Sequence, residues 1–165
     1  MKRWYVVQAQ AHGEARAKRN LERQGFIAWL PRYKKMRRHA GRTESVLKPL
    51  FPRYLFVAFD QERERWRAIL STLGVARLVG GRDGPKPVPE PVIAALRARE
   101  GADGLFELAP QPFRSGDKVR ITEGPLAELE GLFEATSDER RVSILLRLLG
   151  RGVRVTVASS DIEAV

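Results

Sequence analysis

The sequence predicts an α/β protein in which an antiparallel-sheet α/β sandwich is followed by a small β-barrel. Strand-like and helix-like segments alternate over the first 100 of the 165 residues, whereas short apolar alternations between Gly and Asp turns fill the rest. A stretch containing both Gly and Pro lies between the two parts. We therefore expect a first domain over 1–100, a linker over 101–113 and a second domain over 114–165.

The first elements of the sandwich follow from residue type and spacing. Residues 4–7 are aromatic or β-branched and favour a buried strand, and the helix-forming residues 14–24 end at Gly25, which is placed as a C-terminal cap. Segment 53–59 has the strongest strand pattern in the chain and is flanked by prolines that a central strand would not tolerate inside it. Further extended segments are predicted at 26–30, 32–34 and 46–47.

The second half of the sandwich is predicted to contain two more helices. Over 62–73 the apolar residues recur at helical spacing and Gly74 follows, so we expect a helix whose core-facing residues are Trp66, Ile69, Leu70 and Leu73. A short strand is expected at 75–79. A helix is expected to reach from Pro91, in its first turn, to about residue 100.

Two structures compete for the C-terminal domain. Strand-like alternation predicts the barrel, and it recurs at Val119/Ile121, Val142/Ile144/Leu146 and Val153/Val155/Val157. Helical spacing occurs in two other sets, which are Leu126/Leu129/Phe133 and Leu145/Leu148/Leu149. We expect the barrel both in the isolated domain and in the intact chain, with a helical hairpin as the alternative.

Positive charge is concentrated at the front of the chain. The net charge is +10, and residues 1–60 hold 14 Lys or Arg against 4 Asp or Glu. Of the 30 basic residues 23 are Arg, which forms bidentate contacts with phosphate and stacks on bases. This pattern favours a polyanionic partner such as nucleic acid, and a merely well-solvated surface is the alternative.

The predicted helix over 14–24 collects part of this charge on one side. At about 100° per residue, Arg16, Arg19 and Arg23 fall within roughly 60° of one another. Ala17 and Leu21 lie about 100° or more from the centre of this stripe, so burying them leaves the arginines in solvent. The stripe is suited to phosphates and unpaired bases.

The strand predicted at 53–59 is apolar on both faces. Leu55, Val57 and Phe59 point to one side, and the alternate residues Tyr54, Phe56 and Ala58 point to the other. One face is expected to serve the core of the domain. The second must be covered by another part of the chain or by a partner.

Composition and motif searches argue against several classes of protein. The chain has no Cys and only two His, and it contains none of the common nucleotide, hydrolase or metalloprotease motifs. We therefore expect no enzyme activity, no cofactor and no metal. The chain has no apolar run long enough to span a membrane and no signal-peptide pattern, so we expect a cytoplasmic protein.

Two motifs carry a resemblance to a known family. The string GDKVRITEGPLAELEG over 116–131 resembles the KOW motif, and WYVV at 4–7 with PLFPRYLFVAF at 49–59 resembles the N-terminal domain of the NusG family of transcription elongation factors. PLFPRYLFV, STLGV at 71–75 and LLRLLG at 145–150 are more similar to its RfaH-like, operon-specific antiterminator branch. The KOW-motif positions singled out are Gly116, Asp117, Gly124, Pro125 and Gly131.

The resemblance implies a non-enzymatic factor, acting as a monomer, that binds the clamp of bacterial RNA polymerase and suppresses pausing or termination. Tyr54 and Phe56 are then expected at the centre of the polymerase-binding patch, on a face that the domain does not need for its own core. The non-template DNA strand is expected to contact Arg16, Lys18, Arg19, Asn20, Arg23, Gln24 and Thr72.

For the C-terminal domain the resemblance implies an SH3-like KOW barrel. It also implies that a helical hairpin can cover the polymerase site, with autoinhibitory contacts from Leu145, Leu148 and Leu149. A small-subunit ribosomal protein or termination factor Rho is an implied partner of this domain. A ribosome- or RNA-binding KOW module remains the alternative function.

Overall fold

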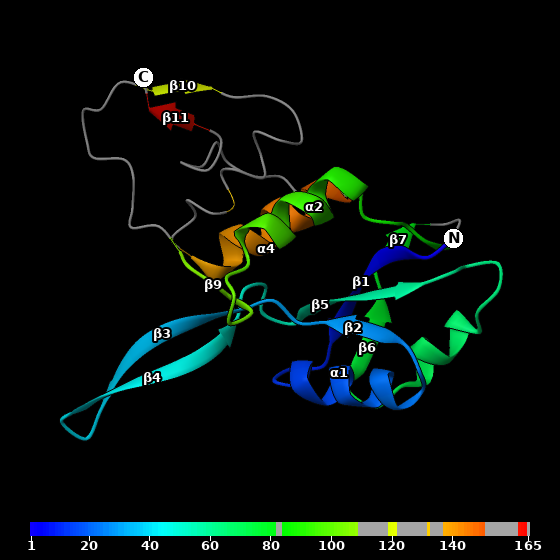
Figure 1. Ribbon diagram of the computed structural model, residues 1–165, viewed down its shortest axis with the longest axis horizontal. Helices are drawn as coiled ribbons and strands as arrows, with labels where there is room; N and C mark the ends of the chain where they lie inside the picture. The colour runs from blue at the N-terminus through cyan, green and yellow to red at the C-terminus, as the bar shows by residue number, and fades with distance from the viewer. Residues whose placement is uncertain (82–83, 109–118, 122–131, 133–136, 151–161, 165) are drawn as a thin grey trace.

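The computed structural model describes residues 1–81, 84–108, 119–121, 132, 137–150 and 162–164. Its main feature is a four-stranded antiparallel sheet in the order β2-β5-β1-β6 (Figure 1). The strands are β1 (Arg3–Ala9), β2 (Ile27–Trp29), β5 (Tyr54–Phe59) and β6 (Val75–Leu78). The sheet confirms the mixed α/β class with antiparallel pairing that the sequence predicts.

Strands β1 and β5 form the centre of this sheet. Their register pairs Arg3 with Phe59 at one end and Gln8 with Tyr54 at the other. All six residues of β5 are buried, as expected for a strand whose two faces are both covered. This position explains why β5 has no polar alternation.

Helix α1 (Glu14–Arg23) covers one face of the sheet, as Figure 1 shows. Ala17 and Leu21 are fully buried and join the core cluster that contains Leu55, Val57 and Phe59. After the helix, Gly25 has a φ of 90°, a conformation that glycine adopts without strain. The predicted helix, its buried pair and its terminating glycine are therefore confirmed.

Helices α2 (Glu90–Arg99) and α4 (Asp138–Leu148) cover the opposite face. Their apolar side chains form one core cluster with Tyr54 and Phe56 of β5. The contributing residues are Val92, Ile93 and Leu96 of α2, and Ile144 and Leu145 of α4 together with the following Leu149. The two faces of the sheet thus have separate cores.

A long hairpin projects from this body (Figure 1). Its strands are β3 (Arg32–His39) and β4 (Arg42–Pro49), paired along their whole length and joined by a turn at Ala40 and Gly41. Strand β9 (Leu105–Phe106) pairs in parallel with the base of β3, and the side chain of Phe106 is buried. The predicted linker over 101–113 therefore contains a short strand, and residues 109–113 lie outside the described part.

The segment predicted as a helix over 62–73 is shorter than expected. It contains only the 3₁₀ helix η1 (Trp66–Ser71), after which the loop leads into β6. Ile69 is buried as predicted, but Leu70 and Leu73 are 50% and 63% exposed, so placing them in the core was wrong. A 3₁₀ helix has three residues per turn, so residues at α-helical spacing do not all fall on its buried side.

The described C-terminal residues form a helix and one strand pair. Residues Val142, Ile144 and Leu146 were expected to alternate in a strand, but they lie in α4. Ser137 caps this helix by accepting a hydrogen bond from the backbone N–H of Arg140 at 3.3 Å, and two carboxylates follow in the first turn. The segment therefore forms the helix that the spacing of its leucines predicts, and not the strand that the alternation predicts.

Strands β10 (Val119–Ile121) and β11 (Ile162–Ala164) form an antiparallel pair, so the strand expected at 119–121 is present. The barrel as a whole is not confirmed. The KOW-motif positions, the alternation at 153–157 and the set Leu126/Leu129/Phe133 lie outside the described residues.

Two very short strands, β7 (Gly80–Gly81) and β8 (Gly84–Pro85), complete the described strands. None of the described helices has the length and apolar character needed to cross a membrane.

Candidate nucleic-acid interface and partner-binding face

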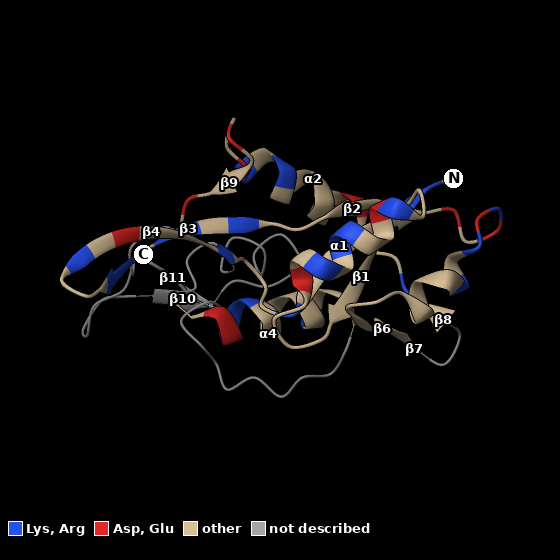
Figure 2. Ribbon diagram, turned by 90° about the horizontal axis from the view of Figure 1, so that it is seen from below, with Lys and Arg blue, Asp and Glu red and all other residues tan. Residues whose placement is uncertain are grey.

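The basic stripe of α1 lies on the solvent side of the helix. Arg16, Arg19 and Arg23 are all exposed, while Ala17 and Leu21 point into the core. Figure 2 shows the basic positions of α1 as blue bands on its ribbon. None of the three arginines forms an ion pair with a residue that the structure describes. The stripe therefore presents three guanidinium groups to a ligand.

The loop after η1 is fastened to the side of α1. The side-chain amide of Asn20 donates to the carbonyl oxygen of Leu73 at 3.1 Å. Gly74 lies so close to the helix that a Cβ atom added there would come within 2.7 Å of the backbone nitrogen of Ala17. Only a glycine fits at this approach. The structure thus joins the stripe and the loop into one surface.

A hydrogen bond between Gln24 and the buried Thr72 also links α1 to this loop. The side-chain amide of Gln24 donates to the hydroxyl of Thr72 at 2.7 Å, and that hydroxyl donates to the carbonyl oxygen of Ala68 at 2.9 Å. Thr72 is only 6% exposed. The structure therefore places Thr72 beneath the surface at which it was expected to contact DNA.

Lys18 lies on the other flank of α1. Its ammonium group pairs with Glu22 one turn later at 2.6 Å, an arrangement that is typical of solvent-exposed helices. Of the seven residues expected at a nucleic-acid interface, the three arginines share one exposed side. Asn20 and Gln24 border that side through the loop contacts.

Tyr54 and Phe56 lie on the face of β5 that α2 and α4 cover. Phe56 is fully buried, with its ring centroid 5.0 Å from that of Trp29 and 6.0 Å from that of Phe51. Tyr54 is 8% exposed. Both rings were expected on a face left free for a partner, but in this conformation they lie in a core cluster that includes Trp29, Phe51 and side chains of α2 and α4.

Helix α4 contributes the leucines that were expected to cover this face. Leu145 and Leu149 are buried in the cluster that contains Tyr54 and Phe56, and Leu148 is partly buried against it. This contact buries apolar surface, and each Å² of apolar surface removed from water stabilises the docked helix by roughly 25 cal/mol. The helix therefore occludes the candidate polymerase-binding face in this conformation.

A group of polar contacts fixes α4 at the base of the hairpin. Arg141 is 1% exposed and donates from Nε to the carbonyl oxygen of Leu50 at 2.9 Å. Asp138 accepts from the hydroxyl of Tyr33 at 3.0 Å, bonds to Arg141, and lies 3.9 Å from the ammonium of Lys48. Burial raises the pKa of Tyr33, and the bond to Asp138 adds to the shift. We call Tyr33, Lys48, Asp138 and Arg141 the latch.

Sequence reasoning missed the latch, although one signal for it exists. Arg141 precedes Leu145, Leu148 and Leu149 by four, seven and eight residues, which is the spacing of a single helix face. A charged residue on an apolar helix face needs a buried partner. The partner, the backbone carbonyl of Leu50 far away in the chain, has no sequence signature.

Sequence reasoning also missed the hairpin as a separate basic surface. Lys34, Lys35, Arg37, Arg38 and Arg42 are exposed along it, and Figure 2 shows the blue bands on β3. The charge count over residues 1–60 already contained this signal. The pairing of β3 with β4 brings these basic residues together on one projecting hairpin.

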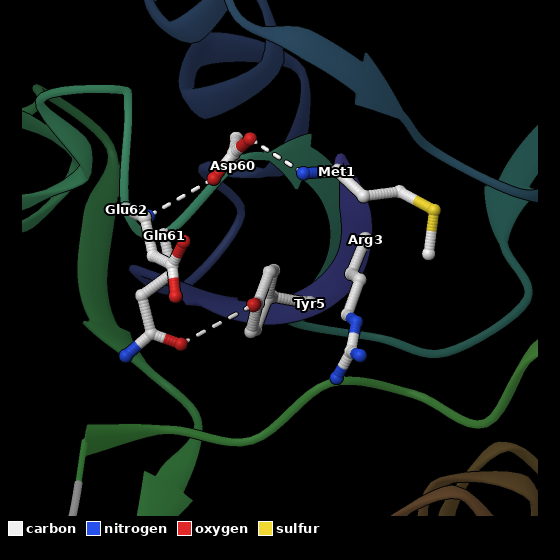
Figure 3. Close-up of a pocket in the computed structure, with 6 residues that line it drawn as sticks. All are labelled: Met1, Arg3, Tyr5, Asp60, Gln61 and Glu62. Atoms are coloured by element: carbon white, nitrogen blue, oxygen red, sulfur yellow. Dashed lines mark hydrogen bonds and ion pairs between the residues drawn. The ribbon is translucent and has the colours of Figure 1, made fainter.

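A hollow of about 570 Å³ lies where β1 begins and the chain leaves β5 (Figure 3). Within it the N-terminal ammonium group of Met1 bonds to Asp60 at 2.6 Å, and the hydroxyl of Tyr5 donates to Gln61 at 3.4 Å. The bond from the ammonium group lowers the pKa of Asp60, as do backbone N–H groups. The charges of Met1 and Asp60 satisfy each other, and the charged residues Arg3 and Glu62 also line the hollow.

Comparisons with known proteins identify relatives of this chain. A family model described as NusG, transcription termination factor nusG, matches residues 2–97, which is more than half of the chain. The protein named transcription termination/antitermination protein NusG is 29% identical in Thermus thermophilus, over 96% of this chain and 96% of that protein. Its namesake in Pseudomonas aeruginosa is 26% identical over 99% of both. A solved structure titled "Domain interaction in Thermotoga maritima NusG" gives a TM-score of 0.44 at 23% identity, covering 76% and 75% of the two chains.

Proposed function

The chain belongs to the NusG family of transcription termination/antitermination factors, and from this premise we propose that it acts as an RfaH-like antitermination factor. In this proposal the Tyr54 and Phe56 face binds the clamp of bacterial RNA polymerase, and the arginine stripe of α1 binds the non-template DNA strand. The observation that carries the proposal is the position of α4. Its leucines occupy the face that the polymerase would need.

The stripe supports the DNA contact through its charge and its rigidity. Arg16, Arg19 and Arg23 point to solvent from a helix held by the core on one side and by the loop at 72–74 on the other. Because the helix is already held in place, binding has to order only the arginine side chains, and the planar guanidinium group loses less freedom per hydrogen bond than a lysine side chain does. Contacts of this kind position a strand without reading its sequence.

The position of α4 supports a closed state in which the polymerase cannot reach the Tyr54 and Phe56 face. A face that is occupied by the chain itself binds a partner only in the fraction of molecules in which the helix has left. The apparent affinity for polymerase is therefore reduced by that fraction. A released C-terminal domain would form the KOW barrel and become available to a small-subunit ribosomal protein or to Rho.

The DNA contact is tested with a fluorescent single-stranded oligonucleotide in a salt titration. We expect the variant R16A/R19A/R23A to lose affinity and its log–log salt slope to fall by roughly 2, because each lost phosphate contact on a single strand contributes about 0.7. The matched control is K34A/K35A/R37A, which removes three cations from the hairpin. Equal slopes in the wild type and the stripe variant would disprove the DNA role.

The polymerase contact is tested separately by affinity capture from a bacterial lysate with the tagged chain. Recovery of RNA polymerase supports the proposal. Recovery of ribosomes without polymerase would instead favour the RNA-binding alternative and refute the polymerase assignment.

A further inference from the structure

The β3–β4 hairpin carries more than half of the net positive charge of the chain. Residues 32–49 contain seven Lys or Arg against one Glu, a net charge of +6 compared with +10 for all 165 residues. Six of the seven cations are exposed, and none of these six forms an ion pair within the described part of the structure. The hairpin projects from the body of the protein, so this charge lies apart from the arginine stripe of α1 (Figure 1).

The strand register sorts the exposed residues of the hairpin onto two faces. Residues directly opposite each other in an antiparallel pair point to the same face, and alternate residues along a strand share it. Lys34 lies opposite Leu47, Met36 opposite Ser45, and Arg38 opposite Thr43. We call the surface formed by these six residues the outer face. All six are exposed, and they include two cations and no carboxylate.

The opposite face of the hairpin is already in contact with α4 at its base. The hydroxyl of Tyr33 donates to Asp138 at 3.0 Å, and Lys48, directly opposite Tyr33, lies 3.9 Å from the same carboxyl group. Farther along this face Glu44 lies opposite Arg37, and its carboxylate repels phosphate groups. The outer face therefore points away from α4 and is the better surface for an anionic partner.

Two apolar side chains lie among the cations of the outer face. Met36 is 61% exposed and Leu47 is 48% exposed, and the register makes them diagonal neighbours across the two strands. The outer face thus combines cations, hydroxyl groups and apolar side chains. These three kinds of side chain read base edges in the major groove of DNA: Lys or Arg bonds to guanine, Ser or Thr bonds to several bases, and an apolar group contacts the methyl group of thymine.

The shape of the hairpin also fits a groove. It closes with a two-residue turn, in which Ala40 and Gly41 have φ angles of 51° and 76°, so no bulky loop widens its end. Beyond the pairing with β9, residues 34–39 extend for about 20 Å at roughly 3.3 Å per residue, and the two strands lie only about 4.8 Å apart. The major groove of B-DNA, about 12 Å wide and about 8.5 Å deep, admits a two-stranded ribbon, whereas the major groove of an RNA duplex is too narrow.

We propose that the hairpin is a second nucleic-acid-binding element, which inserts its outer face into the major groove of duplex DNA. In this arrangement the two cations donate to guanine O6 and N7, the hydroxyl groups bond to neighbouring base edges, and the two apolar side chains pack on thymine methyl groups. The cations on the opposite face raise the general attraction for phosphates without contacting bases. The contact uses other residues and another form of DNA than the single-strand contact proposed for α1, so it stands or fails independently.

The experiment measures binding of the full chain to three fluorescent duplexes of equal length and sequence. The first is unmodified DNA. The second has the same phosphates but carries glucosylated hydroxymethylcytosine, whose sugar fills the major groove, and the third is an RNA duplex. We expect the wild type to bind the unmodified DNA at least about fivefold more tightly than either of the others, because only that duplex has an open major groove.

A matched pair of variants assigns the contact to one face. K34A/R38A removes two cations from the outer face, and K35A/R37A removes two from the opposite face of the same strand. We expect K34A/R38A to lose roughly tenfold or more in affinity for unmodified DNA and little for the glucosylated duplex, since it loses contacts with bases. K35A/R37A should weaken both DNA duplexes by the same smaller factor, because it lowers only the general attraction for phosphates.

A second variant keeps every charge of the hairpin. M36S/L47S should show the salt slope of the wild type, because no phosphate contact is lost. It should also lose any preference for thymine over deoxyuridine in otherwise identical DNA duplexes, since deoxyuridine lacks only the methyl group. A preference that persists in this variant would contradict the orientation proposed for the outer face.

Three other outcomes would overturn the inference. Equal binding of unmodified and glucosylated DNA by the wild type would exclude the major groove. Equal losses for K34A/R38A and K35A/R37A on both DNA duplexes would reduce the contact to general electrostatic attraction. Tighter binding of the RNA duplex would identify an RNA-binding hairpin instead.

The α1 stripe serves as the control that separates this inference from the proposed function. R16A/R19A/R23A should retain the preference for unmodified over glucosylated DNA. If it lost that preference, the stripe and not the hairpin would be the duplex site, and the inference would be wrong. A failure of the stripe on the single-stranded probe concerns only the proposed function, because the hairpin variants are compared on duplexes.

Discussion

Arg141 donates a hydrogen bond from Nε to the backbone carbonyl oxygen of Leu50 at 2.9 Å, although 91 residues separate the two in the chain. The guanidinium group is almost completely buried and also lies 5.0 Å from the ring centroid of Tyr33. A buried charge is tolerated only where its hydrogen bonds are satisfied. This contact therefore defines one docking position for α4 rather than a general apolar association.

Replacing Arg141 by Ala should loosen α4 without unfolding the central sheet. The variant leaves Asp138 without its arginine partner and the carbonyl of Leu50 without this donor, which costs about 2–4 kcal/mol of docking free energy. Hydrogen exchange measures this, with faster exchange expected for α4 amides and unchanged exchange for β1 and β5. Glu139→Gln, an exposed change on the same helix, is the control. Unchanged protection of α4 in R141A would mean that the leucines alone hold the helix.

Placing a charge at Leu145 should open the proposed polymerase-binding face. Leu145 is fully buried against the Tyr54 and Phe56 cluster, so L145E cannot dock without burying an unpaired carboxylate. We expect affinity for reconstituted elongation complexes to rise about tenfold or more, as the competent fraction increases. Reduced affinity in a folded L145E protein would contradict autoinhibition, since it would place Leu145 in the productive contact.

Separating the C-terminal part should change its secondary structure. In the intact chain residues 138–148 form α4, whose buried side packs in the cluster that contains Tyr54 and Phe56. An isolated fragment of residues 101–165 lacks that face, and Gly and Pro within it weaken a helix, so we expect strand signals instead. NMR secondary chemical shifts of the fragment and of the intact chain measure this. Helical shifts for 138–148 in the fragment would exclude a fold switch.

Thr72 should prove to be a supporting residue. T72V keeps the shape but removes two hydrogen bonds, and should lower the free energy of unfolding by about 1–2 kcal/mol. The salt slope of DNA binding should stay unchanged. Chemical denaturation of T72V and of the exposed control Ser71→Ala provides the comparison. Weaker DNA binding at unchanged stability would show that the hydroxyl contacts DNA directly.

The ion pair between Met1 and Asp60 should make stability depend on acid pH. Because the pKa of Asp60 is lowered in the folded state, its contribution is complete above the ordinary carboxyl pKa of about 4 and disappears as the pH falls through the lowered value. The difference in unfolding free energy between the wild type and D60N should therefore be largest near neutral pH and vanish in acid. Glu62→Gln, at the rim of the same hollow, is the matched control. A difference for D60N that does not change with pH would exclude the ion pair as its cause.

Much of the candidate nucleic-acid interface was predictable because it depends on one helix. The spacing of Ala17 and Leu21 decides which side of α1 is buried, and the arginines then have to be exposed. Thr72 and Leu73 were not predictable in the same way. They are neighbours in a turn, and only the packing of Gly74 on α1 decides that the polar residue is buried and the apolar one exposed.

The sequence by itself determined the elements whose patterns are local, namely α1, the two-sided apolar strand β5 and the helix α2. Residue type and periodicity suffice there because the same sheet or helix face is buried in any compact arrangement. The sequence left the segment around Val142 and Leu145 undecided, since its apolar residues satisfy both a period of two and a helical period. Only the tertiary structure decided it. The apolar face of β5 and the carbonyl of Leu50 lie far away in the chain, and they offer the helical form a buried surface and a partner for Arg141 that a strand could not use.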